Sequence, residues 1–375
     1  MINVSEVEGC YGCMACVEAC PKACISKYTD AEGFWYPKVN EEQSIKCKKC
    51  LRVCPRENHI MNQTQAVYGM KNPSEERREQ STSGGFFSTI AENILKRDGV
   101  IFASKFDSDW NVKYDVISSS KDLVDFLGSK YVQSDFGESY TLINRYLSEG
   151  RLVLVVGTPC QLQGVKNYFG DSENLYLLDF VCHGVPGPDV WKKYISHLER
   201  KGKLIEYYFR NKDNGSWHNS GIKYKIGKKV YYKKIGEDTF SRWYFNKGMV
   251  RESCFSCQFK QETRVGDLTM GDFWGIENID KEFDDDKGIS LVLVNTPKGE
   301  RIWEQISNDI EYRSYSCDAI SKRNYELRKQ TSKYRFYKKL YNRFPNFLTF
   351  FFISGVAKKV LLDKVIMRIK TLLKK

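Results

Sequence analysis

Two runs of hydrophobic residues mark the centre of the chain. Residues 152–156 are all apolar, and residues 175–181 are apolar except for one acid and one tyrosine, which is typical of strands buried on both faces of a parallel sheet. Residues 162–169 between them are long enough for a short helix. In such a β–α–β unit both strands end at the same edge of the sheet, where ligands bind in open α/β folds. Cys160 and Cys182 follow the two strands, so we expect them close together at that edge.

The spacing of apolar positions predicts further elements of an α/β core. Apolar residues recurring every three to four positions over residues 86–95 indicate an amphipathic helix, with Ser and Thr before it that can cap its first turn. We also expect strands at 100–103, 114–117, 267–273 and 290–294, a hairpin at 222–234, and helices at 188–200 and 297–307. Residues 61–80 are polar, with a proline and a run of charges, and we interpret them as the linker and the entry to the second domain.

The cysteines of the first part of the chain follow a recognisable spacing. One run reads Cys-x2-Cys-x2-Cys-x3-Cys-Pro and a shorter one Cys-x2-Cys-x3-Cys-Pro, the spacing by which bacterial ferredoxins hold iron–sulfur clusters; the cysteines are Cys10, Cys13, Cys16 and Cys20, then Cys47, Cys50 and Cys54. The sequence therefore predicts a dicluster 4Fe-4S ferredoxin domain over residues 1–62. A pair of zinc knuckles is the alternative, but zinc sites rarely need the x3-Cys-Pro ending.

The second of these clusters lacks one expected ligand. By the usual crossing of the two runs, one cluster is held by Cys10, Cys13, Cys16 and Cys54. The other takes Cys20, Cys47 and Cys50, but position 44, where its fourth cysteine is expected, is a serine. Three accounts stay open: Cys24 replaces the missing ligand, Ser44 binds through oxygen, or the cluster has three irons. We favour Cys24, whose alternative role is that of a small buried hydrophobe.

Four cysteines of the later chain form a second set. These are Cys160, Cys182 and the pair Cys254 and Cys257, which leaves Cys317 without a partner set. Twelve ligands suit three four-iron clusters, and a structural zinc is the alternative for the later four. Cysteines that serve as metal ligands need a reducing compartment, and the N-terminus has no basic and apolar signal segment, so we expect a cytoplasmic protein.

The net charge of +12 is unevenly distributed. From Ile320 to the end the chain has 16 Lys and Arg against 2 Asp and Glu, so this tail carries +14 and the other residues sum to −2. We therefore expect no nucleic-acid binding by the core. Residues 345–357 of the tail are uncharged and rich in Phe, too short to span a bilayer but suited to an anionic membrane surface. Packing of a helical tail on the core is the alternative.

Other common cofactor motifs are missing from the 375 residues. The sequence has no Gly-x-Gly-x-x-Gly and no Gly-Lys-Ser/Thr P-loop, so neither a nicotinamide fold nor an NTPase is indicated. The hydrophobic content of 41% is that of a packed globular protein rather than a disordered one.

Six short motifs resemble one known family. In order, they are Ser83-Gly84-Gly85, residues 128–134, residues 157–161, residues 182–186, Cys254-x2-Cys257 and residues 271–275. Together they resemble the coenzyme F-420 hydrogenase/dehydrogenase beta-subunit family over about the first 300 residues. The resemblance implies a ferredoxin-like dicluster domain fused to a larger α/β FAD-binding core, residues 63–319, that has its own cluster, followed here by the basic tail at 320–375. Archaeal members pass electrons between clusters, FAD and a deazaflavin, and similar fusions occur in bacterial polysaccharide gene neighbourhoods.

The resemblance also implies which residues contact FAD. The glycine loop before residue 86 can hold the FAD phosphates at a helix N-terminus, although a simply capped helix is the alternative. The other expected FAD contacts are Lys130, Tyr131, Gln133, Ser134, Thr158, Pro159, Gln161 and Trp274. His183 is the candidate for proton transfer, with a structural role as its alternative.

We therefore expect an iron–sulfur flavoprotein oxidoreductase. Electrons would pass between the clusters, FAD and a two-electron acceptor or donor, with a ferredoxin or another oxidoreductase subunit as redox partner. One alternative is a non-catalytic electron-transfer subunit of a larger complex, linked to polysaccharide biosynthesis. A further one is a zinc-bearing module that uses the basic tail on a membrane or RNA.

Overall fold

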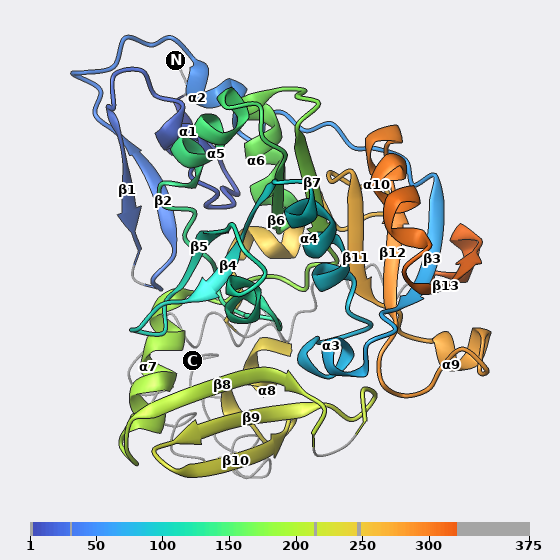
Figure 1. The fold of residues 1–375 in the computed structure, drawn as a ribbon. Helices are drawn as coiled ribbons and strands as arrows, with labels where there is room; N and C mark the ends of the chain where they lie inside the picture. The colour runs from blue at the N-terminus through green and yellow to red at the C-terminus, as the bar shows by residue number, and fades with distance from the viewer. Residues whose placement is uncertain (1–2, 31, 214–215, 246–248, 321–375) are drawn as a thin grey trace, which may run out of the picture.

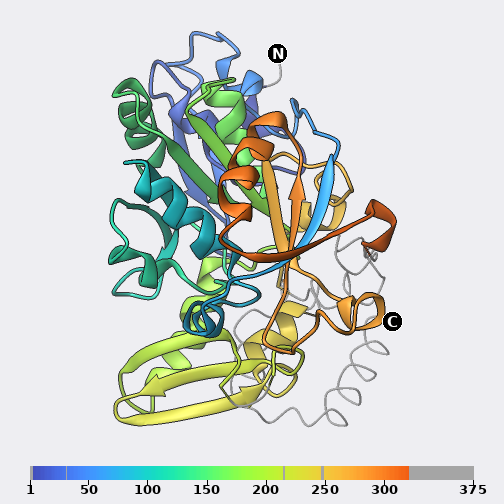
Figure 2. The ribbon, with the colours of Figure 1, turned by 45° about the vertical axis from the view of Figure 1, so that its right-hand side comes forward.

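The computed structural model describes residues 3–30, 32–213, 216–245 and 249–320 as a mixed α/β protein with three sheets (Figure 1). A small domain with a two-stranded sheet and a separate three-stranded sheet lie at opposite ends of a large sheet, as two views show (Figures 1 and 2). The predicted tail, apart from Ile320, lies outside the described residues. No helix among the described residues is long and apolar enough to cross a membrane.

The small domain is built of two similar halves. Each half has a Cys-x2-Cys turn that opens a one-turn helix, α1 (Ala15–Glu18) or α2 (Lys49–Arg52). Met14 and Lys48, which directly follow the first cysteine of each turn, both have a left-handed φ of 60°. Between the halves lies an antiparallel hairpin of β1 (Ile25–Thr29) and β2 (Trp35–Val39), and a short helix, η1 (Val4–Glu6), begins the domain.

The large sheet has eight strands in the order β13-β3-β12-β11-β7-β6-β4-β5. Its centre, β4, β6, β7 and β11, is parallel, and the outer strands are antiparallel. The bounds are β3 (Ala66–Lys71), β4 (Val100–Phe106), β5 (Val112–Ile117), β6 (Val153–Gly157), β7 (Leu175–Phe180), β11 (Leu268–Asp272), β12 (Ser290–Val294) and β13 (Glu311–Tyr315).

Alternate residues of the central strands fill two separate cores. Leu154 and Val156 of β6 face α4 (Phe86–Lys96) and α10 (Pro297–Ser307), where Trp303 packs. Val153 and Val155 face the other side, which is covered by α5 (Ser139–Ser148), α6 (Pro159–Phe169) and the small domain. Because both faces are covered, every residue of β6 is buried, as the apolar run predicts.

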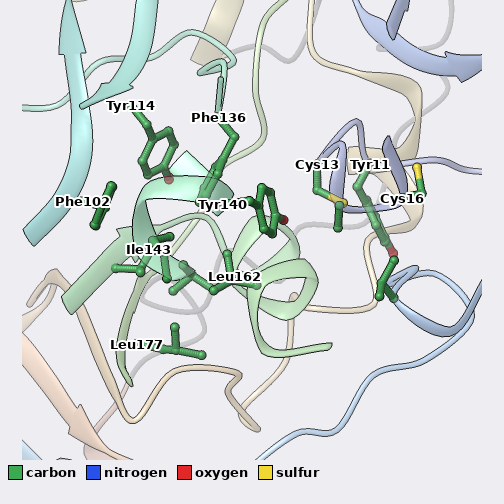
Figure 3. Packing of buried hydrophobic residues seen from close by; sticks show 14 of the residues in the cluster. Tyr11, Cys13, Cys16, Phe102, Tyr114, Phe136, Tyr140, Ile143, Leu162 and Leu177 are labelled. Atoms are coloured by element: carbon green, nitrogen blue, oxygen red, sulfur yellow. The ribbon is translucent and has the colours of Figure 1, made fainter. Parts of the chain in front are cut away.

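The small domain is part of the second core. Figure 3 shows Tyr140 of α5 lying between the strand residues and Cys13 of the small domain. Gly164 of α6 makes this contact possible, because a Cβ there would lie 3.1 Å from the Cβ of Ala15 and 3.2 Å from the sulfur of Cys13. The small domain is therefore packed on the core.

A second contact between the two parts involves a pair of glycines. A Cβ on Gly187, just before α7 (Pro188–Glu199), would lie 2.5 Å from the carbonyl oxygen of Glu32. In return, a Cβ on Gly33 would lie 2.7 Å from the backbone nitrogen of Asp189, and Gly33 has a φ of +84°. Each backbone therefore approaches the other to a distance that no larger residue permits.

The three-stranded antiparallel sheet packs one face on α7 and α8 (Thr239–Phe245). Its strands are β8 (Leu204–Asn211), β9 (Gly221–Ile226) and β10 (Lys229–Lys234), so the predicted hairpin is confirmed, with Gly227 in its turn. The remaining short elements are α3 (Glu75–Gln80), η2 (Asp122–Phe126), η3 (Glu252–Ser256), α9 (Ile276–Ile279) and η4 (Cys317–Ala319).

Within residues 61–80, predicted as a linker and the entry to the second domain, the linker part is wrong from residue 66 onwards. Residues 66–71 form β3, which pairs with β12 and β13, and residues 75–80 form α3. Val67 and Met70 are almost completely buried in the hydrophobic core, and the strand is paired on both sides. The other strands and helices predicted above are confirmed.

Candidate functional site

Twelve cysteines line three cavities, four in each. The outer site, in the small domain, is lined by Cys20, Cys24, Cys47 and Cys50. The Cys20 and Cys24 sulfurs lie 3.3 Å apart. Burial raises the pKa of Cys20, but hydrogen bonds from Cys24 and from backbone amides outweigh it and the pKa is lowered. Ser44 lines the same cavity, so the fold brings both candidates for the missing ligand to this site.

The inner site lies deeper in the small domain. It is lined by Cys10, Cys13, Cys16 and Cys54, with Val4, Val7 and Pro55 around them. Burial, followed by the neighbouring cysteines, raises the pKa of Cys13 and Cys16. A metal that binds these thiols must therefore displace their protons.

The core site joins the ends of two parallel strands to a later loop. Cys160 is in the first turn of α6, which follows β6, and Cys182 follows β7. Cys254 is in η3, and Cys257 directly follows it. All four line one cavity, so the expected closeness of Cys160 and Cys182 is confirmed. Burial raises the pKa of Cys182 to about 12, and the Cys254 thiol adds to it.

Tyr11 connects the inner and core sites, because its side chain lines both cavities. Its hydroxyl donates to Gln258 at 3.1 Å and accepts from Arg56 at 3.2 Å, and its ring lies 5.4 Å from that of Phe259. Tyr11 directly follows Cys10 in the chain, so the two thiol sets share a wall.

Sets of four thiols are the donors that both iron–sulfur clusters and structural zinc accept. Each of the three cavities has such a set, which agrees with the grouping expected from the spacing. The residues therefore fit three clusters, and the role of each cysteine as a ligand stays a prediction.

The glycine loop lies at the start of α4, where it is held by β12. The Ser83 hydroxyl donates to the carbonyl of Ile289 at 2.7 Å, and the amide of Gly84 donates to the Ser290 hydroxyl at 3.0 Å. Gly85 has a left-handed φ of 92°, and no side chain caps the helix it precedes. The first amides of α4 are therefore without a side-chain cap, and their role in holding the FAD phosphates stays a prediction.

Lys130 and Tyr131 are adjacent in the chain but contact different neighbours. The Lys130 ammonium donates to the carbonyls of Phe126 and Leu127 at 2.8 and 2.9 Å, and burial lowers its pKa to about 7. Tyr131 stacks on Tyr244 with ring centroids 4.8 Å apart. Lys130 is therefore occupied by its own loop rather than extended towards a ligand.

Three other expected FAD contacts, Ser134, Thr158 and Gln161, form an internal network. The amide nitrogen of Gln161 donates to the Ser134 carbonyl at 3.1 Å, and its oxygen accepts from the Thr158 hydroxyl at 3.0 Å. Gln133 donates to the carbonyl of Gly12 at 3.3 Å, which places it at the contact with the small domain. Pro159 begins α6 and lines the core cavity. Of these five residues Thr158 and Pro159 line the core cavity, and the role of all five towards FAD stays a prediction.

Trp274 follows β11 and lies against a buried arginine. It stacks on Trp217 with centroids 4.9 Å apart, and the Arg210 guanidinium lies 5.1 Å from its ring. Arg210 donates to Asp272 at 3.0 Å and to Ser220 at 2.7 Å, while its buried Nη2 has no acceptor among the described residues. Burial alone would lower the pKa of Arg210, but Asp272 raises it.

His183 directly follows a cysteine of the core site. Its ring lies 5.2 Å from that of Tyr244 and 5.5 Å from that of Phe245. Through Tyr244 it is joined to Tyr131, so these aromatic residues form one group beside the core cavity. This position agrees with a role in proton transfer, which stays a prediction.

Several residues of these sites could not be found from the sequence. Tyr11 lies within the ferredoxin spacing, but nothing there shows that it reaches a second site. Arg210 and Arg251 are single basic residues that belong to no sequence motif. They stand out only in the structure, where both side chains are buried. The only signal for Arg251 is its place three residues before Cys254.

Comparison with known families agrees with this arrangement. The N-terminal model of the coenzyme F420 hydrogenase/dehydrogenase beta subunit matches residues 67–139, and its C-terminal model matches residues 150–317. A 4Fe-4S dicluster domain model matches residues 9–58. No curated protein matches the chain.

One solved structure with similarity is the F420-reducing [NiFe] hydrogenase complex from Methanosarcina barkeri, derivatised with xenon. The identity is 14%, the match covers 76% of this chain and 93% of that chain, and the TM-score is 0.48.

The dicluster domain and the mixed α/β core define an iron–sulfur electron-transfer subunit of an oxidoreductase. The two beta-subunit models together match more than half of the chain. The chain belongs to the coenzyme F420 hydrogenase/dehydrogenase beta-subunit family.

Proposed function

We propose that the chain is an iron–sulfur flavoprotein oxidoreductase in which electrons pass through the outer, inner and core sites to FAD. The observation that carries this proposal is the shared wall of Tyr11, which lines both the inner and the core cavity. A cluster in each site would then belong to one continuous path. The direction of net flow depends on the potentials of the partners.

The exposure of the cysteines supports the outer site as the place of exchange with a redox partner. Cys47 of the outer site is exposed, whereas Cys13, Cys16 and Cys54 of the inner site are buried. A ferredoxin or another subunit of a complex therefore approaches most closely at the outer site.

The end of the path is the carboxyl edge of the parallel strands. The unpaired Nη2 of Arg210, the aromatic faces of Trp274 and Tyr131, and the uncapped start of α4 are the features there that suit a dinucleotide with an aromatic ring system. FAD, when bound, supplies the exchange between single electrons from the clusters and electron pairs for the substrate. We propose a deazaflavin or another small two-electron carrier as that substrate.

The test is anaerobic purification followed by assays of iron, sulfide and flavin. We expect about twelve irons per chain and noncovalent FAD. As a matched pair, Arg210→Met should lower the retained flavin without changing iron, and Arg145→Met, at an exposed ion pair on α5, should change neither. Protein with full iron but no flavin would contradict the flavin part of the proposal.

A non-catalytic electron-transfer subunit is the second candidate, favoured by the match to a beta subunit. The two candidates differ in turnover. The isolated chain, reduced with dithionite, should reduce a two-electron acceptor if it is itself the enzyme, and should only exchange single electrons with dyes if the chemistry lies on a partner.

A further inference from the structure

The described part of the chain holds four deeply buried arginine side chains, and three of them have an aspartate partner. Arg78 pairs with Asp285 at 2.6 Å, Arg210 with Asp272 at 3.0 Å, and Arg264 with Asp179 at 2.8 Å. This is expected, because a buried charge without a counter-charge is strongly destabilising.

The fourth arginine, Arg251, is 1% exposed and forms no ion pair with any carboxylate of the described residues. Its Nε donates to the Cys10 carbonyl and its Nη2 to the Trp35 carbonyl, both at 2.8 Å, and its Nη1 donates to Gln133 at 3.3 Å. All three acceptors are neutral. The guanidinium also lies over the ring of Tyr36, 4.1 Å from its centroid. The hydrogen bonds and the aromatic ring give the Arg251 guanidinium polar and cation–π contacts, but none of these partners carries a negative charge.

The position of Arg251 shows what can compensate it. Its side chain reaches the backbone of Cys10, a residue of the inner site. Its own carbonyl accepts from the amide of Cys254, a residue of the core site, at 3.0 Å. Arginine stays charged at any pH at which the protein is folded. The missing negative charge is therefore to be sought in the two thiol sites on either side.

We propose that Arg251 is the counter-charge of the iron–sulfur cluster in the inner site and raises its reduction potential. This inference rests on the proposed function, because it requires a cluster at the four inner cysteines. A cluster bound by four thiolates is an anion, and it becomes more negative when it takes up an electron. A fixed positive charge in a buried position stabilises the reduced form more than the oxidised form. Arg251 acts here as a positioning and tuning residue, since it contacts the backbone of a cysteine and no reacting atom.

This role explains why Arg251 sits at the contact of the two domains. Its fork holds the Cys10 loop and the Trp35 carbonyl, both of the small domain, while its backbone belongs to the loop of the core site. The space is fully used: a Cβ on Gly12 would lie 2.7 Å from Nη1 of Arg251. The charge is thus fixed relative to both sites, which is what an electrostatic effect on potential requires.

The test is a redox titration of the anaerobic full-length protein followed by EPR. Arg251→Met should lower the one-electron reduction equilibrium constant of one ferredoxin-domain cluster at least tenfold, which corresponds to about 59 mV. Arg251→Lys, which keeps a charge, should show less than half of that shift. Arg78→Met is the matched control, since it removes a buried arginine whose partners belong to the core alone, and it should leave the cluster potentials unchanged.

Arg251→Gln covers the case in which the Met variant does not fold. It keeps a polar side chain with N–H donors and removes the charge, so the potential should fall as in the Met variant. A neutral variant with full iron and unchanged potentials overturns the inference while the proposed function stands. Equal shifts in the Lys and Gln variants overturn it as well, because charge is then not the cause. If anaerobically purified wild-type protein contains no iron and no sulfide, both the inference and the proposed function are wrong.

Discussion

The sulfur atoms of Cys20 and Cys24 lie 3.3 Å apart in the outer site, although only Cys20 belongs to the ferredoxin spacing. Cys24 directly precedes β1, and Ser44 lines the same cavity. The structure thus brings a spare thiol to the site at which the expected ligand is a serine.

We expect Cys24→Ala to remove one cluster and to leave two. Iron should fall from about twelve to about eight per chain, because the outer site keeps only three thiols. Ser44→Ala is the control and should keep full iron. The measurement is iron and sulfide content with EPR of the reduced protein. If Ser44→Ala loses iron and Cys24→Ala does not, an oxygen ligand is the better account.

A variant of the core site separates an iron–sulfur cluster from zinc. Cys257→Ser should lower iron by about four per chain and leave the signals of the two ferredoxin-domain clusters in place. If the site holds structural zinc instead, the same variant should lose zinc at constant iron. Metal analysis of both proteins distinguishes these results, and Cys317→Ser, at an exposed cysteine outside the three cavities, should change neither metal.

The buried pair of Arg264 and Asp179 should dominate the stability of the core site. Asp179 also accepts from the amides of Val265 and Gly266, so Arg264→Met leaves a buried carboxylate without its cation. We expect a loss of about 3–5 kcal/mol, seen as an earlier midpoint in anaerobic denaturation. Adding Asp179→Asn, which keeps an acceptor without the charge, should recover much of the loss.

A control and a contrary result define this test. Arg145→Met removes an exposed pair with Glu149 and should cost less than about 1 kcal/mol. A double variant no more stable than Arg264→Met alone would mean that the hydrogen bonds of Arg264, rather than its charge, stabilise this region.

Lys130 should make the stability of the protein depend on pH. Burial lowers its pKa to about 7, well below the value of about 10.4 for an exposed lysine. Between these values the unfolded chain binds more protons than the folded one, so stability rises with pH in this window. Below pH 7 both forms are protonated and the effect is absent.

The measurement is the melting temperature of wild type and Lys130→Met from pH 6 to pH 9. The melting temperature of the wild type should rise relative to that of the variant between pH 7 and pH 9. Below pH 7 the difference between the two melting temperatures should be constant. A difference that stays flat over the whole range would show that the amine remains charged on its three carbonyl acceptors.

The sequence predicts the parts of this protein in which one residue type repeats at a fixed spacing. The cysteine spacing gives the grouping of the inner-site thiols, and the apolar runs give β6, β7 and β12. β3 was missed because Gly69 and Lys71 interrupt its short apolar run and polar residues flank it, although Val67 and Met70 are buried in the core. The α/β core with an attached ferredoxin-like domain is confirmed.

The contacts between the two domains could not be predicted in this way. Arg251 and Tyr11 are single residues whose partners in the other domain are more than 200 positions away, and no local pattern reports such pairs. The network of Gln161 is similar: its neighbours in the chain suggest a ligand contact, whereas its hydrogen bonds are made within the protein. Long-range polar contacts of this kind become visible only when the chain is folded.

The close contact of Gly33 with Asp189, and of Gly187 with Glu32, has a consequence for the way electrons travel. A domain that moves between two docking positions needs a loosely packed, hydrated interface. Here the two backbones are so close that there is no room for a methyl group between them. If electrons pass from the inner to the core site as proposed, the ferredoxin-like domain transfers them without moving between docking positions. The rate of transfer from the inner to the core site should then be independent of solvent viscosity, because no part of the chain has to diffuse.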